Sequence, residues 1–269
     1  MKKTILFTLL SSSAIGASLN AITYEHFENE KISAHILTVD PKEEKIEIFN
    51  CNGVDTVSNI AKKNGSIAAI NGGFYGYGDH LGKPKGILQI NGNRLSETDR
   101  SRGAFGFDKE MRVVLIDRLD SSETNRLLPL FHPENESNWN ELENILGSTP
   151  LLLVDGKKPE DYNDEKVAES FLNEKFSRSA VGILEDGKIL FVMVEGMENG
   201  MTIEELADFM KERGCLSALN LCGGHSSALY YRGDLFHSSH LRDDESEDET
   251  IFKEKPVGNM LLITEKDEI

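Results

Sequence analysis

The sequence predicts an α+β protein, a single mixed domain that is rich in strands, has few helices and follows an N-terminal signal peptide. Short apolar runs bounded by glycine, proline, asparagine or aspartate recur along the 269 residues, as in strands joined by tight turns. The clearest helix signal is a capping box at residues 202–205. Since no repeat or linker divides the chain, we expect residues 22–269 to form one domain.

The N-terminus has the pattern of a secretory signal. Lys2 and Lys3 precede the apolar residues 5–10, and small residues follow up to Ala21. Cleavage after Ala17 or Ala21 would fit this pattern. The apolar run is far shorter than the roughly 20 residues that a membrane span needs. We therefore expect residues 1–21 to be a signal peptide and the mature chain to be exported, periplasmic or secreted, with no stable membrane insertion.

The first half of the chain has strand patterns at residues 33–40, 45–50 and 67–70, with a short helix expected over residues 55–64. Asn91-Gly92 is a hairpin signal. Residues 102–107 and 113–116 form a second expected strand pair. Residues 119–144 are polar and irregular and are expected to be a surface excursion.

The second half begins with an expected strand at residues 151–154 and a short helix from Asp164. Residues 178–183 and 189–194 form the clearest hairpin. The capped helix that starts at Thr202 is expected to end at Gly214. Strands are expected on both sides of residues 222–227, and a hairpin is expected to be completed at residues 230–236. Residues 243–254 are expected to form an acidic loop, and residues 257–264 a last strand.

The net charge of −17 argues against nucleic acid as a partner. A phosphate-containing small ligand stays compatible with it, because a few basic side chains can reverse the field inside a cleft. The cysteines are Cys51, Cys215 and Cys222. Their odd number leaves at least one thiol without an internal partner, and their spacing is not that of a zinc site. No cofactor or metal is expected.

Two strands end in paired glycines beside polar residues. Residues 67–70 run into Asn71-Gly72-Gly73, and residues 218–221 run into Cys222-Gly223-Gly224. Such a turn brings amides and side chains close to a ligand. A hairpin or bulge with a polar tip explains each pattern equally well on local grounds.

The sequence resembles the phosphodiester glycosidase family over about residues 67–264. The resemblance rests on Asn71-Gly72-Gly73-Phe74-Tyr75, on Arg178-Ser179-Ala180-Val181-Gly182, and on Asn220-Leu221-Cys222-Gly223-Gly224-His225-Ser226-Ser227. We call residues 71–75 the first motif and residues 220–227 the signature segment. The resemblance implies a hydrolase that cleaves a glycosidic bond in a sugar phosphodiester or a related envelope glycan, with a glycan or sugar phosphate as its ligand.

The chain departs from the family pattern at four positions, one of which is Glu195, where the family typically has Asp. Cys222 stands where the family has Asp, His225 where it usually has Gly, and Met197 where it has Arg. Three accounts follow for Cys222. In the first, activity persists with Glu195 in the acid–base role. In the second, catalysis is lost and the cleft only binds a glycan or sugar phosphate. In the third, Cys222 and His225 form a thiolate–imidazole pair that performs another nucleophilic reaction.

The predicted site joins these positions. The catalytic candidates are Glu195, Cys222 and His225. In the predicted substrate-binding set, side-chain amides bind sugar hydroxyl groups, while arginines and backbone N–H groups bind a phosphate. The set is Asn71, Gly72, Gly73, Arg102, Arg178, Asn220, Gly223, Gly224, Ser226 and Ser227.

Overall fold

The computed structural model describes residues 21–98, 100–121, 126–196, 200–238 and 253–266. It contains three sheets, in which neighbouring strands pair antiparallel. The predicted signal peptide and most of the acidic loop lie outside the described residues, so both stay predictions. Within the described residues, no helix is long and apolar enough to span a bilayer.

The first sheet has six strands. In spatial order they are β1 (Ile22–Glu28), β2 (Ser33–Val39), β13 (Ile189–Val194), β12 (Arg178–Leu184), β14 (Cys215–Asn220) and β11 (Leu151–Leu153). The second sheet also has six. They are β6 (Asn93–Ser96), β5 (Leu88–Ile90), β10 (Asn144–Ser148), β7 (Arg102–Phe107), β8 (Val114–Ser121) and β9 (Leu127–Pro129).

The third sheet has five strands, and they come from both ends of the chain. They are β16 (Asp234–His237), β15 (Ala228–Tyr231), β4 (Ala68–Asn71), β17 (Val257–Glu265) and β3 (Glu44–Asp55). The helices are α1 (Val57–Lys63), α2 (Glu136–Glu141), α3 (Glu169–Asn173) and α4 (Ile203–Glu212), with short 3-10 turns at Gly78–His80, Pro133–Asn135 and Gly224–Ser226.

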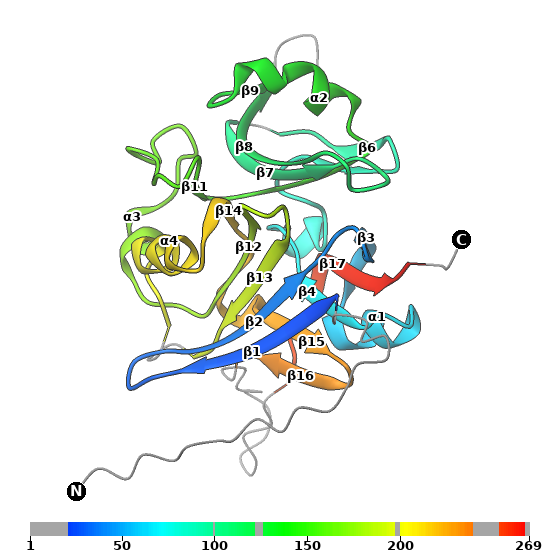
Figure 1. Ribbon diagram of the computed structural model, residues 1–269, viewed down its shortest axis with the longest axis vertical. Coiled ribbons are helices and arrows are strands. Elements are labelled where there is room, and N and C mark those ends of the chain that lie inside the picture. Colours follow the sequence, from blue (N-terminus) through cyan, green and yellow to red (C-terminus); the bar gives the residue numbers. More distant parts are fainter. Residues whose placement is uncertain (1–20, 99, 122–125, 197–199, 239–252, 267–269) are drawn as a thin grey trace, which may run out of the picture.

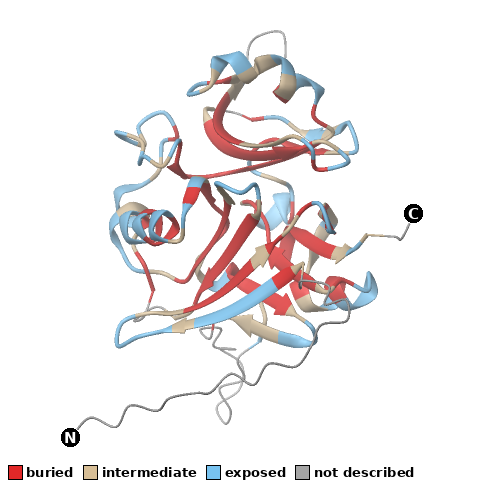
Figure 2. Ribbon diagram, in the orientation of Figure 1, coloured by how far each residue is buried: buried red, intermediate tan, exposed pale blue. Residues whose placement is uncertain are grey.

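The first and third sheets face each other, and the second sheet forms a lobe at one end (Figure 1). Alternate residues of the strands fill the space between them, with Leu37, Val181 and Phe191 from the first sheet meeting Ile70 and Leu261 from the third. Helix α4 covers the other face of the first sheet, and α1 covers the other face of the third. The central strands are therefore buried on both sides (Figure 2).

Most expected elements occur close to their predicted bounds. The predicted capping box is present, since Thr202 accepts a hydrogen bond from the amide of Glu205 and Glu205 bonds back to the amide of Thr202. This cap begins α4, whose apolar face packs on the first sheet. The expected hairpin at residues 178–194 is the β12–β13 pair. The strand-rich α+β class is therefore confirmed.

The stretch at residues 119–144 was wrongly expected to be a surface excursion. It continues β8, contains β9 and α2, and buries Trp139 completely against Gly106 of β7. The elements are short and polar on their outer side, so the sequence pattern did not reveal the apolar side chains that form the core of the lobe. The helix expected from Asp164 begins instead at Glu169, and strand β1, directly after the predicted cleavage site, was not foreseen.

Candidate functional site

The two glycine motifs meet, although 151 residues separate Asn71 from Cys222. Strands β4 and β14 lie in the two facing sheets, and each motif begins where its strand ends. The amide of Cys222 donates to the carbonyl of Gly72 at 2.9 Å, and Asn71 Nδ2 donates to the carbonyl of Cys222 at 2.6 Å. The first motif and the signature segment therefore form one site at the junction of the first and third sheets.

Asn71 and Asn220 hold this junction together and do not face solvent. The oxygen of Asn71 accepts from the hydroxyl of Ser179 and the amide of Ala228, so this side chain bridges several strands. Asn220 Nδ2 donates to the carbonyl of Thr149 at 2.7 Å, while its buried oxygen lacks a partner among the described residues. Both side chains are fully buried. The amide of Asn71 and Nδ2 of Asn220 bond the protein's own groups, so the predicted contact of these residues with ligand hydroxyls stays a prediction.

The glycines of the first motif permit close packing. The amides of Gly72 and Gly73 donate to the backbone and side-chain oxygens of Asn259, respectively. A Cβ on Gly72 would lie 2.2 Å from the Asn259 side chain, and one on Gly73 would lie 2.3 Å from the carbonyl oxygen of Gly147. Since β17 accepts from both amides, the predicted contact of Gly72 and Gly73 with a substrate stays a prediction.

The signature turn is more open. Gly224 has φ +61° and open space around its Cα, and its amide donates to the carbonyl of Ser177 at 2.7 Å. A Cβ on Gly223 would lie 2.9 Å from that same carbonyl oxygen. Both glycines are half-buried and His225 is exposed. The expected pair of free amides is thus reduced, since the amide of Gly224 is bonded internally and that of Gly223 bonds the Cys222 sulfur.

Cys222 is a buried thiol beside two hydroxyl groups. It packs with Tyr75 and Val257 and bonds the side chain of Ser226, and Ser226 Oγ lies 3.3 Å from the hydroxyl oxygen of Tyr75. Burial raises the pKa of the Cys222 thiol, although Ser226 and two lysines oppose this. The neutral thiol is therefore favoured, which weakens the thiolate–imidazole account. All three cysteines carry free thiols.

Ser227 and Ser226 are both buried, as the serines that close the signature segment. The Ser227 carbonyl accepts from the amide of Ser238, and its buried hydroxyl lacks a protein partner. These serines secure the turn against β15, so their predicted contact with substrate remains a prediction.

Glu195 lies just after β13 in a network of polar side chains. Its Oε1 is 2.8 Å from Nε2 of His35, and its Oε2 accepts from the hydroxyl of Ser33 at 2.9 Å. An ionised carboxylate only accepts, so Nε2 of His35 donates to Glu195, while Nδ1 of His35 lies 2.8 Å from the hydroxyl oxygen of Tyr24. The bond from His35 lowers the pKa of Glu195, more than burial raises it. Glu195 is therefore an ionised, partly exposed carboxylate.

Glu195 and Arg178 lie on opposite faces of the first sheet. Arg178 is paired in register with Val194, so the two share a face and Glu195, the next residue, points to the other. Extending this register by one residue places Ser177 beside Glu195, and the Ser177 carbonyl accepts from the amide of Gly224. The structure thus brings Glu195, but not the Arg178 guanidinium, to the inner side of the signature turn.

Arg178 is fully buried on the α4 side. Its guanidinium donates to the carbonyls of Phe171, Glu174 and Met201 and lies 4.5 Å from the centre of the Phe171 ring. Its Nη1 has no hydrogen-bond partner in the described part of the chain. Burial lowers the pKa of Arg178 to about 10. Direct contact with a phosphate would require this packing to open, so the predicted phosphate contact remains a prediction.

Arg102 opens β7 in the second sheet and is buried. The Cδ atom of Arg102 would lie 3.4 Å from a Cβ placed on Gly86. Gly86 also packs against Gly147, and Gly147 packs against Gly73 of the first motif. Arg102 is thus linked to the first motif through a stack of glycines. Its predicted role in holding phosphate also remains a prediction.

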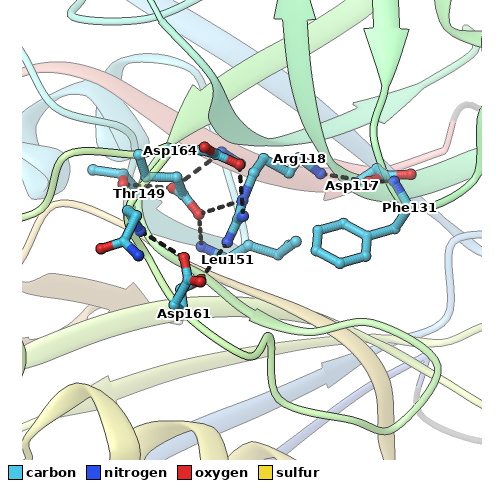
Figure 3. Close-up of polar contacts among 10 residues, drawn as sticks. Asp117, Arg118, Phe131, Thr149, Leu151, Asp161 and Asp164 are labelled. Carbon is cyan, nitrogen blue, oxygen red and sulfur yellow. Dashed lines mark hydrogen bonds and ion pairs between the residues drawn. The ribbon is translucent and has the colours of Figure 1, made fainter.

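The buried carboxylate of Glu165 joins the lobe to the first sheet, and Figure 3 shows the polar contacts around Arg118, Thr149 and Leu151. Glu165 accepts from Nε of Arg118 at 3.1 Å, from the hydroxyl of Thr149 at 2.6 Å and from the amides of Leu151 and Gly103. Because the Thr149 carbonyl holds Asn220, this network fixes the start of the signature segment.

Comparison with known proteins assigns the family. Residues 64–264 match the sequence profile of the phosphodiester glycosidase family. The chain belongs to the phosphodiester glycosidase family. The resemblance seen in the two motifs is therefore confirmed. In this family Cys222 occupies the Asp position of the signature, and the structure places there a neutral buried thiol that offers no negative charge.

Curated relatives are distant. The mouse N-acetylglucosamine-1-phosphodiester alpha-N-acetylglucosaminidase is 22% identical over 234 residues, which cover 81% of this chain and 44% of the mouse protein. The bovine protein of the same name is 25% identical over 194 residues, covering 70% of this chain and 36% of its own length. The chain therefore spans less than half the length of these relatives.

Solved structures share the fold. A hypothetical protein from Synechocystis has a TM-score of 0.73 at 16% identity, covering 91% of this chain and 62% of that one. The zebrafish N-acetylglucosamine-1-phosphodiester alpha-N-acetylglucosaminidase catalytic domain, auto-inhibited by its pro-peptide, has a TM-score of 0.66 at 20% identity, covering 91% of this chain and 82% of that one.

His35, Ser33 and Tyr24 were not foreseen as neighbours of the site. The one signal in the sequence is a histidine inside an otherwise apolar strand, residues 34–37. Its partner is 160 residues away, so periodicity could not identify it. Among the described residues, no group of three or more His, Cys, Asp and Glu side chains could hold a metal ion.

Proposed function

We propose that this member of the phosphodiester glycosidase family hydrolyses the bond between the sugar C1 and the phosphate oxygen of a glycosyl phosphodiester. The supporting observation is the junction of the first motif with the signature segment, beside an ionised Glu195. The names of the mouse and bovine relatives point to N-acetylglucosamine-1-phosphodiesters as the substrate class.

Glu195 suits one half of this reaction. As the C1–oxygen bond breaks, positive charge builds on the sugar ring and the phosphate takes the bonding electrons. An ionised carboxylate stabilises that positive charge, or accepts the proton of the attacking water. Because its pKa is lowered, Glu195 is a poor proton donor near neutral pH. A phosphate leaves already stabilised as an anion, so the reaction depends little on such a donor.

A second function has one specific observation in its favour. The thiol of Cys222 is buried and neutral where the family signature has a carboxylate. If the reaction needs that carboxylate, this chain binds a glycan or sugar phosphate without cleaving it. The fold and the junction of the motifs would serve either role.

Hydrolysis of UDP-N-acetylglucosamine, or of a synthetic N-acetylglucosamine-1-phosphodiester, tests the proposal. The enzyme reading predicts release of N-acetylglucosamine by the unmodified protein and a loss of at least about 100-fold in Glu195→Gln, the range of a lost acid–base group. Release by Cys222→Asp alone would favour the binding role. If neither the unmodified protein nor Cys222→Asp releases N-acetylglucosamine, the proposed activity is overturned.

We also propose export, which rests on the pattern of residues 1–21. Expression of the full chain in a bacterium, followed by fractionation and N-terminal sequencing of the product, tests this. Mature protein that begins near residue 18 or 22 outside the cytoplasm is the expected result; full-length protein in the cytoplasm would contradict it.

A further inference from the structure

Two lysines converge on one exposed tyrosine next to the signature segment. Nζ of Lys255 lies 3.3 Å from the hydroxyl oxygen of Tyr77 and 5.1 Å from the centre of its ring. Nζ of Lys85 lies 5.9 Å from the same ring centre. Tyr77 is 57% exposed. We call these side chains the Lys85–Tyr77–Lys255 cluster.

Neither lysine forms an ion pair with a carboxylate of the described residues, although the chain carries a net charge of −17. Other lysines, such as Lys158 and Lys188, do pair with acidic side chains. Two ammonium groups held on one aromatic ring without a carboxylate repel each other, and a bound anion would relieve that repulsion.

The cluster is tied to the signature segment by short contacts. The ring of Tyr77 lies 5.4 Å from that of Tyr75, and the hydroxyl of Tyr75 lies 3.3 Å from Ser226 Oγ. The same hydroxyl donates to the carbonyl of Pro256, next to Lys255, at 2.9 Å. The amide of Lys85 donates to the carbonyl of Phe74. Both lysines are therefore anchored to the first motif.

The two positive charges reach the signature segment. Both Lys255 and Lys85 act to lower the pKa of the Cys222 thiol, against the larger effect of burial. Both lysines are therefore close enough to Cys222 to act on the charge at that residue, where the resemblance places the family Asp. By contrast, the Arg178 guanidinium is enclosed on the other face of the first sheet.

We propose that Lys85 and Lys255 hold the phosphate of the departing group of a glycosyl phosphodiester, with the ring of Tyr77 between them. The identity of the ligand as a leaving group rests on the proposed function. The phosphate is a monoanion in the diester and becomes a monoester that approaches a dianion after the C1–oxygen bond breaks. Two ammonium groups therefore bind the product phosphate, and the transition state that leads to it, more tightly than the substrate.

Binding of UMP, whose phosphomonoester group stands in for the terminal phosphate of the departing group (UDP in the case of UDP-N-acetylglucosamine), is measured by isothermal titration calorimetry at low salt and tests the site without requiring turnover. The double variant Lys85→Ala/Lys255→Ala is expected to bind UMP at least about 10-fold more weakly, and each single variant to lose part of that affinity. Lys83→Ala is the matched control, because Lys83 is an exposed lysine of the same loop, whereas the ring contacts of Tyr77 with lysines among the described residues involve Lys85 and Lys255. The UMP affinity of Lys83→Ala should stay within about 2-fold, since an exposed charge outside the cluster is screened by salt.

Uridine and N-acetylglucosamine serve as uncharged probes, and their binding should not change in the double variant. Equal UMP binding by the double variant and the unmodified protein would overturn the proposal. So would an equal loss in Lys83→Ala, which would indicate a general surface field. Circular dichroism confirms that each variant is folded.

Kinetics separate this proposal from the proposed activity. If UDP-N-acetylglucosamine is not cleaved but UMP binding depends on both lysines, the proposed function fails and the anion site stands. If it is cleaved equally well by the double variant, the anion site is wrong and the activity stands. Where both hold, the double variant loses activity on the phosphodiester and keeps it on an N-acetylglucosaminide with an uncharged leaving group.

Discussion

Arg118 and Arg178 are both buried, but they are compensated in different ways. Arg118 meets the buried carboxylate of Glu165 at 3.1 Å, and Asp164 lies 3.7 Å away. Arg178 forms no ion pair with a described carboxylate; it donates to backbone carbonyls and packs between Phe171 and Phe176. Burial lowers the pKa of Arg178 to about 10.

The comparison separates charges that stabilise the fold through an internal ion pair from charges that have no such pair. Around Glu165 the buried guanidinium and the buried carboxylate are internal partners of each other, so the network joins the lobe to the first sheet. Around Arg178 and the Lys85–Tyr77–Lys255 cluster, positive charge lies on two sides of the signature turn without an ion pair to a carboxylate of the described residues. A site built to receive an anion has this property.

Glu165→Gln should break the compensated region with the largest effect. The substitution leaves Arg118 buried beside a neutral amide, and removal of one partner of a buried pair costs about 3 kcal/mol of unfolding free energy. Urea denaturation measures this. The double variant Glu165→Gln/Arg118→Met should recover part of the loss; the same loss in the double variant would mean that the ion pair does not hold the lobe.

Arg178→Met should cost less stability, about 2 kcal/mol, because it removes hydrogen bonds to backbone carbonyls but no paired charge. Its effect on UMP binding decides what the uncompensated charge does. Weaker UMP binding in a folded variant would support the predicted role of Arg178 in phosphate binding. Unchanged binding would assign Arg178 to the support of residues 171–176 alone.

Thr149→Val tests whether the two regions are coupled. It removes the hydroxyl that donates to Glu165 at 2.6 Å, while the carbonyl that holds Asn220 remains. We expect a loss of about 1 kcal/mol in urea denaturation, the value of one buried hydrogen bond. Ligand affinity should be unchanged. A fall in affinity as large as in the double lysine variant would show that the network controls the site.

Glu195→Gln gives the smallest effect on stability, and its sign depends on pH. The pKa of Glu195 is lowered from 4.5 by the bond from His35, so the folded state favours the ionised form. That contribution is present above pH 4.5 and is lost as the pH falls through the folded pKa. The stability difference between the unmodified protein and Glu195→Gln should therefore shrink on acidification, as measured by thermal unfolding from pH 7 to pH 3.

A constant difference over that range would show that His35 and Ser33 do not hold Glu195 ionised. His35→Gln offers a matched control, because it keeps a polar group near Glu195 without the imidazole. In that variant the pH dependence assigned to Glu195 should become weaker.

The sequence by itself determined the strand and helix pattern, the capping box of α4 and the family, because these depend on local periodicity and on short motifs with fixed spacing. It also pointed to the first motif and the signature segment as one site. It was misleading for residues 119–144, where short elements carry their apolar side chains on one face and bury Trp139.

Only the tertiary structure decided which groups of the site residues have partners inside the protein. The side chain of Asn71 and Nδ2 of Asn220 form bonds that close the junction, and the amides of Gly72 and Gly73 donate to β17. His35 is brought to Glu195, and Lys255 to Tyr77, across large sequence separations. The physical reason is that a motif fixes which groups a strand end offers, while the neighbouring strands determine which of those groups stay free for a ligand.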